Sequence, residues 1–240
     1  MKLIEHIKDP ARVLVIWQRP DANIKGGTGD RYVVGEVRRD DGRVYLEYYN
    51  NADTAQAREL GFTGFTSFPV TDGMLYNGSV ETVLAKRLAP TSRSDYRDYL
   101  LSHRIDPEQA DKLSVLGLLA YTGGKLAGDG FSFAHTFDDA VPPFDFTFEI
   151  AGFRHNAGMK HFEPLTMLDG KEVQFVPEPT NIKDKEAIAV ISDGVLLGHV
   201  PKGLRTVMRG LIEAHTVTGH VTRLNGTQDR PCVVILVQVR

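Results

Sequence analysis

The residues best suited to recognise a ligand lie in the second half of the chain, around the predicted helix 201–215. A β-rich run ends at His199, and Pro201 then opens this helix. Free backbone N–H groups at a helix N-terminus favour anions, so His199 could donate to a phosphate there. The alternative is a histidine that packs as a satisfied structural residue. The sequence leaves both roles open.

A basic edge is expected on the same helix. Lys202, Arg205 and Arg209 fall within about 60° of one another on a helical wheel, beside an apolar stripe. A solvated helix face is the alternative to a phosphate-binding edge. Because the whole chain carries a net charge of −3, any phosphate contact has to be local.

Several other chemistries find no support in the sequence. Gly123-Gly124-Lys125 is not followed by the serine or threonine of a phosphate-binding loop, and no Gly-x-Ser-x-Gly nucleophile motif occurs. His155 and His161 have no cysteine or third histidine at zinc-like spacing. We therefore expect no catalytic residues, no metal and no cofactor.

Composition indicates a globular protein, with 42% hydrophobic and 25% charged residues. No window reaches the roughly 18–20 apolar residues of a membrane span, and the first residues lack the apolar core of a secretion signal. The single cysteine, Cys232, lies in an apolar run and cannot form an intrachain disulfide. We expect a cytoplasmic protein that does not enter a membrane.

A domain boundary is predicted at residues 137–145, where Pro142 and Pro143 favour an extended connection. The expected domains are 1–140 and 145–240. In the first, the Asp41-Gly42 turn predicts a β-hairpin, and helices are expected over 53–60, 91–104 and 107–122. The second domain is expected to be a small β-barrel with one packed helix. Its predicted strands are 145–152, 171–177, 186–192, 195–200, 216–224 and 231–239.

The segment 176–190, VPEPTNIKDKEAIAV, resembles the HIRAN domain over about 90 residues, from Phe146 to Val239. The family pattern is Glu-Pro-x-Asn-x-x-Asp-x-x-Ala-Ile-x-Val, followed by Gly-His or Gly-Tyr before a helix. The strand that ends at Arg154 is similar to the family's opening strand. The matching residues are Glu178, Pro179, Asn181, Asp184, Ala187, Ile188, Val190, Gly198 and His199.

This resemblance implies an OB-like or SH3-like β-barrel that binds DNA, single-stranded or with a free 3' end. Asp184 would accept a hydrogen bond from a terminal sugar hydroxyl, unless it serves only as a turn former. Lys183 and His155 stand where the family commonly has aromatic residues, which removes stacking contacts of roughly 1–3 kcal/mol per base. The candidate nucleic-acid-binding residues are Arg154, His155, Lys183, Asp184, His199, Lys202, Arg205 and Arg209.

Residues 31–134 are similar in element order to the N-terminal subdomain of HipA-type toxin kinases. The order runs from the strand at 34–37 through the Asp41-Gly42 turn and 68–70 to a helix at 84–88. It continues with 116–124 and a strand at 131–134. This resemblance implies an α+β domain that contacts another protein and holds no catalytic residues.

The sequence thus predicts an α+β protein: a HipA-N-like α+β domain followed by a HIRAN-like barrel. The function that it favours is a non-enzymatic adaptor that binds DNA and contacts a kinase-like or repressor-like protein. The alternative is a protein-interaction module of a toxin-antitoxin or defence system that does not bind DNA.

Overall fold

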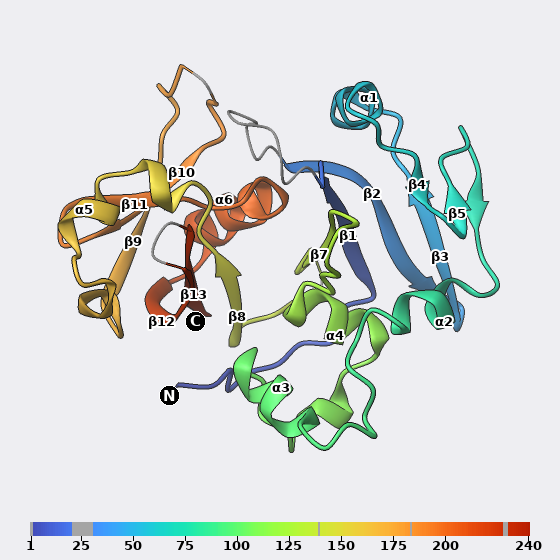
Figure 1. Ribbon diagram of the computed structural model, residues 1–240, viewed down its shortest axis with the longest axis horizontal. Helices are drawn as coiled ribbons and strands as arrows, with labels where there is room; N and C mark the ends of the chain where they lie inside the picture. Colours follow the sequence, from blue (N-terminus) through green and yellow to red (C-terminus); the bar gives the residue numbers. More distant parts are fainter. Residues whose placement is uncertain (1, 21–30, 139, 183, 228–229) are drawn as a thin grey trace. The chain divides into compact units, whose positions relative to one another are not determined.

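The computed structural model describes residues 2–20, 31–138, 140–182, 184–227 and 230–240 (Figure 1). The fold is mixed α+β, and the chain divides into two compact units. One unit is Lys8–Phe137, here called the N-terminal unit. The other, the C-terminal unit, combines Asp138–Arg240 with Met1–Ile7. No described helix is both long and apolar enough to cross a membrane.

An antiparallel sheet forms the centre of the N-terminal unit, in the order β6-β3-β2-β1-β7. The predicted hairpin is confirmed: β2 pairs with β3, and Asp41 and Gly42 both have positive φ, at 45° and 74°. A small hairpin, β4 with β5, lies outside this sheet. The strands are β1 Arg12–Gln18, β2 Arg31–Asp40, β3 Arg43–Tyr48, β4 Gly64–Phe65, β5 Phe68–Pro69, β6 Leu75–Tyr76 and β7 Phe131–His135.

The helices of the N-terminal unit match the predictions in part. Helix α1 is confirmed, and Asn51 caps it by accepting from the Thr54 N–H at 2.9 Å. The predicted helix 91–104 is wrong at its start, because turns precede Tyr96. The predicted helix 107–122 is interrupted, since Ser114 caps a new helix there. The elements are α1 Ala52–Glu59, α2 Val80–Ala85, α3 Tyr96–Ser102, η1 Ala110–Lys112 and α4 Val115–Thr122.

The C-terminal unit contains a six-stranded antiparallel sheet in the order β11-β10-β9-β12-β13-β8. Each of the six predicted strands is observed, with ends shifted by up to three residues. Alternating buried side chains follow the strands, as in β8, where Phe144, Phe146 and Phe148 are buried. The strands are β8 Phe144–Glu149, β9 Glu172–Pro177, β10 Ile188–Ser192, β11 Val195–His199, β12 Val217–Thr227 and β13 Arg230–Val239.

This sheet curls, because its two edge strands meet. Ala151, two residues after β8, pairs with His199 at the end of β11, through backbone hydrogen bonds of 2.9 and 3.0 Å. A Cβ atom at Gly198 would lie 2.4 Å from the Ala151 carbonyl oxygen. Glycine therefore permits the close approach of the two edges, and the sheet forms a half-barrel.

One longer helix, α6 Arg205–Ala214, follows β11 after a single turn, η4 Lys202–Leu204 (Figure 1). The predicted apolar stripe is confirmed: Leu204, Met208 and Leu211 are buried. The short elements between β8 and β9 are η2 Phe153–His155, α5 Gly158–His161 and η3 Leu165–Leu168.

The first residues of the chain belong to the C-terminal unit, whereas the predicted boundaries, 1–140 and 145–240, assign them to the first domain. The carboxylate of Asp145 accepts the backbone N–H groups of Glu5 and His6, at 2.9 and 3.0 Å. The Asp145 N–H in turn donates to the His6 carbonyl oxygen at 3.0 Å. These bonds join residues 139 or 140 positions apart in the sequence, so a search of the sequence for a linker does not reveal them.

Candidate nucleic-acid interface

Three segments of the C-terminal unit meet at the end of strand β11. The pairing of Ala151 with His199 places the η2 segment beside this strand end. The loop 178–187 reaches it through a contact between Glu178 and His199. The chain then continues directly from His199 into η4 and α6. Most of the candidate residues from the sequence lie on these segments.

On η2, Arg154 and His155 are both exposed. The Arg154 Nε donates to the His155 Nε2 at 2.8 Å. The bond requires that His155 Nε2 accept, so it holds for the tautomer with the proton on Nδ1. Arg154 thus presents its positive charge to solvent near the paired residues Ala151 and His199.

His199 contacts the carboxylate of Glu178, a pairing that the sequence did not predict. Its Nε2 lies 3.0 Å from a carboxylate oxygen of Glu178, and the Asn181 side-chain amide donates to the same oxygen at 3.0 Å. Hydrogen bonds from Asn181 and then from His199 hold the pKa of Glu178 below its ordinary value. The contact with Glu178 fits a packed histidine, but it does not decide between the two roles that the sequence leaves open. No hydrogen bond of the other ring nitrogen is described, so His199 can still meet a ligand there.

Asp184 shapes the loop and binds the helix. Its carboxylate pairs with the Arg205 guanidinium and accepts the Glu186 N–H at 3.0 Å. The Asp184 N–H is bonded to the Asn181 side-chain oxygen at 3.3 Å. The side chain is nevertheless 40% exposed, so its carboxylate remains open to solvent on one side.

The basic edge of α6 is partly neutralised by this loop. Arg205 is 14% exposed and pairs with Asp184, while Arg209 pairs with Glu186 at 3.1 Å and with the Lys185 carbonyl at 3.3 Å. Lys202 lies on η4, half-buried, one turn before them. The carboxylates of Asp184 and Glu186 therefore lower the positive charge that the helical wheel predicted for this edge of α6. In the sequence, the alternating charges of residues 183–186 were the signal that could have indicated this neutralisation.

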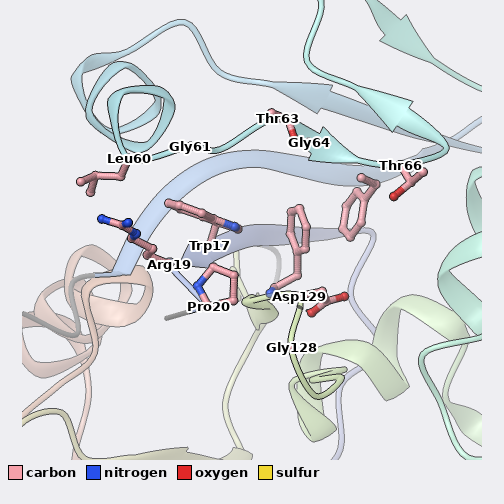
Figure 2. Close-up of a pocket in the computed structure, with 12 residues that line it drawn as sticks. Trp17, Arg19, Pro20, Leu60, Gly61, Thr63, Gly64, Thr66, Gly128 and Asp129 are labelled. Carbon is pink, nitrogen blue, oxygen red and sulfur yellow. Dashed lines mark hydrogen bonds between the residues drawn. The ribbon is translucent and has the colours of Figure 1, made fainter. Parts of the chain in front are cut away.

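Of the candidate residues, Lys183 lies outside the described part of the chain. The other seven lie on the three converging segments. Among them, Arg154 contacts His155 on η2, and Asp184 of the loop contacts Arg205 of α6. Two cavities formed by described residues, one of them shown in Figure 2, lie in the N-terminal unit instead. The candidate interface is thus an open surface formed by three converging segments, and neither of these cavities is part of it.

Comparison with known proteins finds a family match within this unit. The family model described as HIRAN domain matches residues 143–233. The crystal structure of the HIRAN domain of human HLTF is similar at 20% identity, with a TM-score of 0.31, over 40% of this chain and 74% of that one. A crystal structure of a protein from Lactobacillus plantarum is similar at 22% identity, with a TM-score of 0.30, over 40% and 98%. No curated protein matches the chain.

Proposed function

From the premise that residues 143–233 form a HIRAN domain, we propose that the C-terminal unit binds DNA and acts without catalysis. The observation that carries the proposal is the convergence of η2, the loop 178–187 and η4 at the end of β11. This brings Arg154, His199 and Lys202 onto neighbouring segments of one half-barrel. Such a surface fits an OB-like or SH3-like barrel that holds a DNA strand across its edge.

The contacts in this proposal are made mainly with the DNA backbone. Arg154 and Lys202 hold phosphates. Because Nε2 faces the Glu178 carboxylate, the second ring nitrogen of His199 donates to a phosphate or sugar oxygen in the doubly protonated form of the ring. Arg205 and Arg209 add little net charge, because Asp184 and Glu186 pair with them. Binding is therefore of moderate affinity and weakens as salt rises, since each phosphate contact releases condensed counterions.

A free 3' end is the substrate form that we propose for this surface. The Asp184 carboxylate has about four lone-pair sites in all, and Arg205 and the Glu186 N–H use two of them. A terminal sugar hydroxyl can donate to a remaining site, whereas an internal nucleotide has that oxygen esterified. Single-stranded DNA is the form in which such an end is most accessible.

The N-terminal unit is proposed to contact another protein, and one feature favours this as the main function of the chain. Helix α3 buries Leu100, while Tyr96 and Tyr99 are only half-buried and stack with their ring centres 6.1 Å apart. Tyrosines are enriched at protein interfaces. In this second proposal the chain is an interaction module, related to toxin-antitoxin or defence proteins, and the half-barrel is a scaffold.

We predict that Lys202→Glu weakens binding to all DNA sequences alike. The change replaces a phosphate-binding cation by a repelling charge, and about a tenfold loss or more is expected at low salt. Fluorescence anisotropy of labelled oligonucleotides at two salt concentrations measures it. Lys112→Glu, at an exposed position in the N-terminal unit, makes the same change in net charge and is expected to have no effect. Equal loss in both variants would refute the local interface.

We also predict that Asp184→Ala removes the preference for a free 3' end, measured as the ratio of affinities for free and blocked oligonucleotides. Arg205→Gln breaks the same ion pair but keeps the carboxylate. It is expected to lower affinity for both oligonucleotides while leaving their ratio unchanged. A ratio that falls equally in both variants would show that the ion pair, and not the carboxylate, sets the preference. Wild-type protein with no salt-sensitive binding at micromolar concentration would favour the interaction module.

A further inference from the structure

The segment 150–162, which contains η2 and α5, carries basic side chains and no aspartate or glutamate. Its basic side chains are all exposed, and they are Arg154, His155, Lys160 and His161. Two cations and two imidazoles therefore face solvent on a segment that has no negative side chain. The DNA-binding surface described above uses only the first pair, and Lys160 and His161 have no role in it.

Buried residues fix this segment on the half-barrel. Phe153 and Phe162 are 3% and 1% exposed. Helix α5 packs against β11 at Gly158, where an added Cβ would lie 2.7 Å from a side-chain atom of Leu197. Because Phe153, Gly158 and Phe162 face the barrel, the basic side chains between them are turned toward solvent.

The two cations of the segment are not neutralised within the described part of the chain. No described carboxylate forms an ion pair with Arg154 or Lys160. Glu163, three residues after Lys160, is exposed and does not bind it. On α6, by contrast, carboxylates of the loop 178–187 pair with both arginines. An external polyanion therefore meets less competition at η2 and α5 than along α6.

Helix α5 extends the candidate nucleic-acid interface along β11. Ala151 pairs with His199 at the end of this strand, and Gly158 meets Leu197 two residues earlier. Since a strand rises about 3.3 Å per residue, the contact with α5 lies about 7 Å from His199 along β11. This is roughly two nucleotides of a B-form strand, which rises about 3.4 Å per nucleotide. A DNA strand held near His199 therefore reaches α5 within a few nucleotides.

We propose that Arg154, His155, Lys160 and His161 form one phosphate-binding surface, here called the η2–α5 surface. It holds the DNA backbone a few nucleotides away from the end that lies near Asp184. Lys160 supplies a full charge, and the His161 ring supplies an N–H donor for a phosphate oxygen. This inference rests on the proposed DNA binding and adds the path of the strand, which crosses η2 and α5 and does not follow α6.

The variant Lys160→Gln tests the η2–α5 surface, because it removes one charge from an exposed position. For a single strand of about 12 nucleotides at about 50 mM salt, we expect a loss of affinity of about five- to tenfold. The slope of log K against log salt is expected to become shallower by about 0.7. Lys160→Arg keeps the charge and is expected to retain wild-type affinity. Lys112→Gln makes the same change in net charge in the N-terminal unit and is expected to have no effect.

The two DNA proposals fail in different ways. Wild-type affinity and slope in Lys160→Gln overturns the η2–α5 surface, and a loss in Lys202→Glu at the same time leaves the DNA-binding proposal standing. Equal losses in Lys160→Gln and Lys112→Gln also overturn the surface, because net charge alone would then explain them. A wild-type protein without salt-sensitive binding overturns both proposals.

Two further measurements identify the place and the partner. In NMR spectra of the full chain, the amide signals of residues 158–161 are expected to shift when the oligonucleotide is added, and unchanged signals there overturn the η2–α5 surface. Poly-glutamate is expected to bind much more weakly than the oligonucleotide. If it binds as tightly, with the same loss in Lys160→Gln, the surface belongs to an acidic protein segment and the assignment to DNA is wrong.

Discussion

Replacing Arg87 by methionine is expected to lower the free energy of unfolding of the N-terminal unit by about 3–5 kcal/mol. The guanidinium is 6% exposed and binds the Asp129 carboxylate through two nitrogens. It also donates to the carbonyl oxygens of Gly124 and Phe131, at 2.8 and 3.4 Å. Methionine fills much of the volume but leaves the carboxylate without its cation and two carbonyls without their donor.

Urea unfolding followed by the fluorescence of Trp17 measures this change in the unit concerned. Asp129 is 34% exposed, so water can partly solvate its stranded charge and the loss should lie toward the lower value. Arg58→Met is the control, because Arg58 and Asp72 are 41% and 71% exposed, and such a pair contributes at most about 1 kcal/mol. Equal losses for the two variants would contradict the structural role of Arg87.

The double variant Arg87→Met with Asp129→Asn is expected to recover part of the lost stability. The asparagine carries no charge to strand and can still accept the Phe131 N–H, which the Asp129 carboxylate accepts at 3.1 Å. A double variant less stable than the sum of the single changes would show that Asp129 has another essential partner.

Asp145→Ala is expected to destabilise the C-terminal unit by about 3–4 kcal/mol. The carboxylate is fully buried and accepts the N–H groups of Glu5 and His6. Its second oxygen lies 2.7 Å from an Arg240 nitrogen, close enough for an ion pair although the two are not aligned for a hydrogen bond. Alanine removes the group that joins both ends of the chain to β8.

Thermal unfolding and hydrogen exchange test this prediction together. In Asp145→Ala the amide protons of Glu5 and His6 are expected to exchange much faster than in the wild type. Asp169→Ala, at an exposed position of the same unit, is expected to change stability by less than about 0.5 kcal/mol. Unchanged exchange at Glu5 and His6 would mean that the first residues are held by other contacts.

Local pattern in the sequence determined most of the elements of this protein. The Asp41-Gly42 turn identified its hairpin, because both residues tolerate positive φ. The run of short β-rich segments identified the strands of the C-terminal unit, and an apolar stripe that includes Leu204, Met208 and Leu211 identified α6. The HIRAN resemblance rested on residues within one continuous segment. Helix starts were harder to predict: the helix expected over 91–104 begins only at Tyr96.

Tertiary structure alone decided which groups meet. The pairing of Glu178 with His199 and of Asp184 with Arg205 joins residues 21 positions apart, and it depends on the path of a loop. The attachment of the first residues to Asp145 likewise depends on contacts between distant segments. Periodicity and turn chemistry act over a few residues, whereas the charge and the shape of a surface depend on which distant side chains the folded chain brings together.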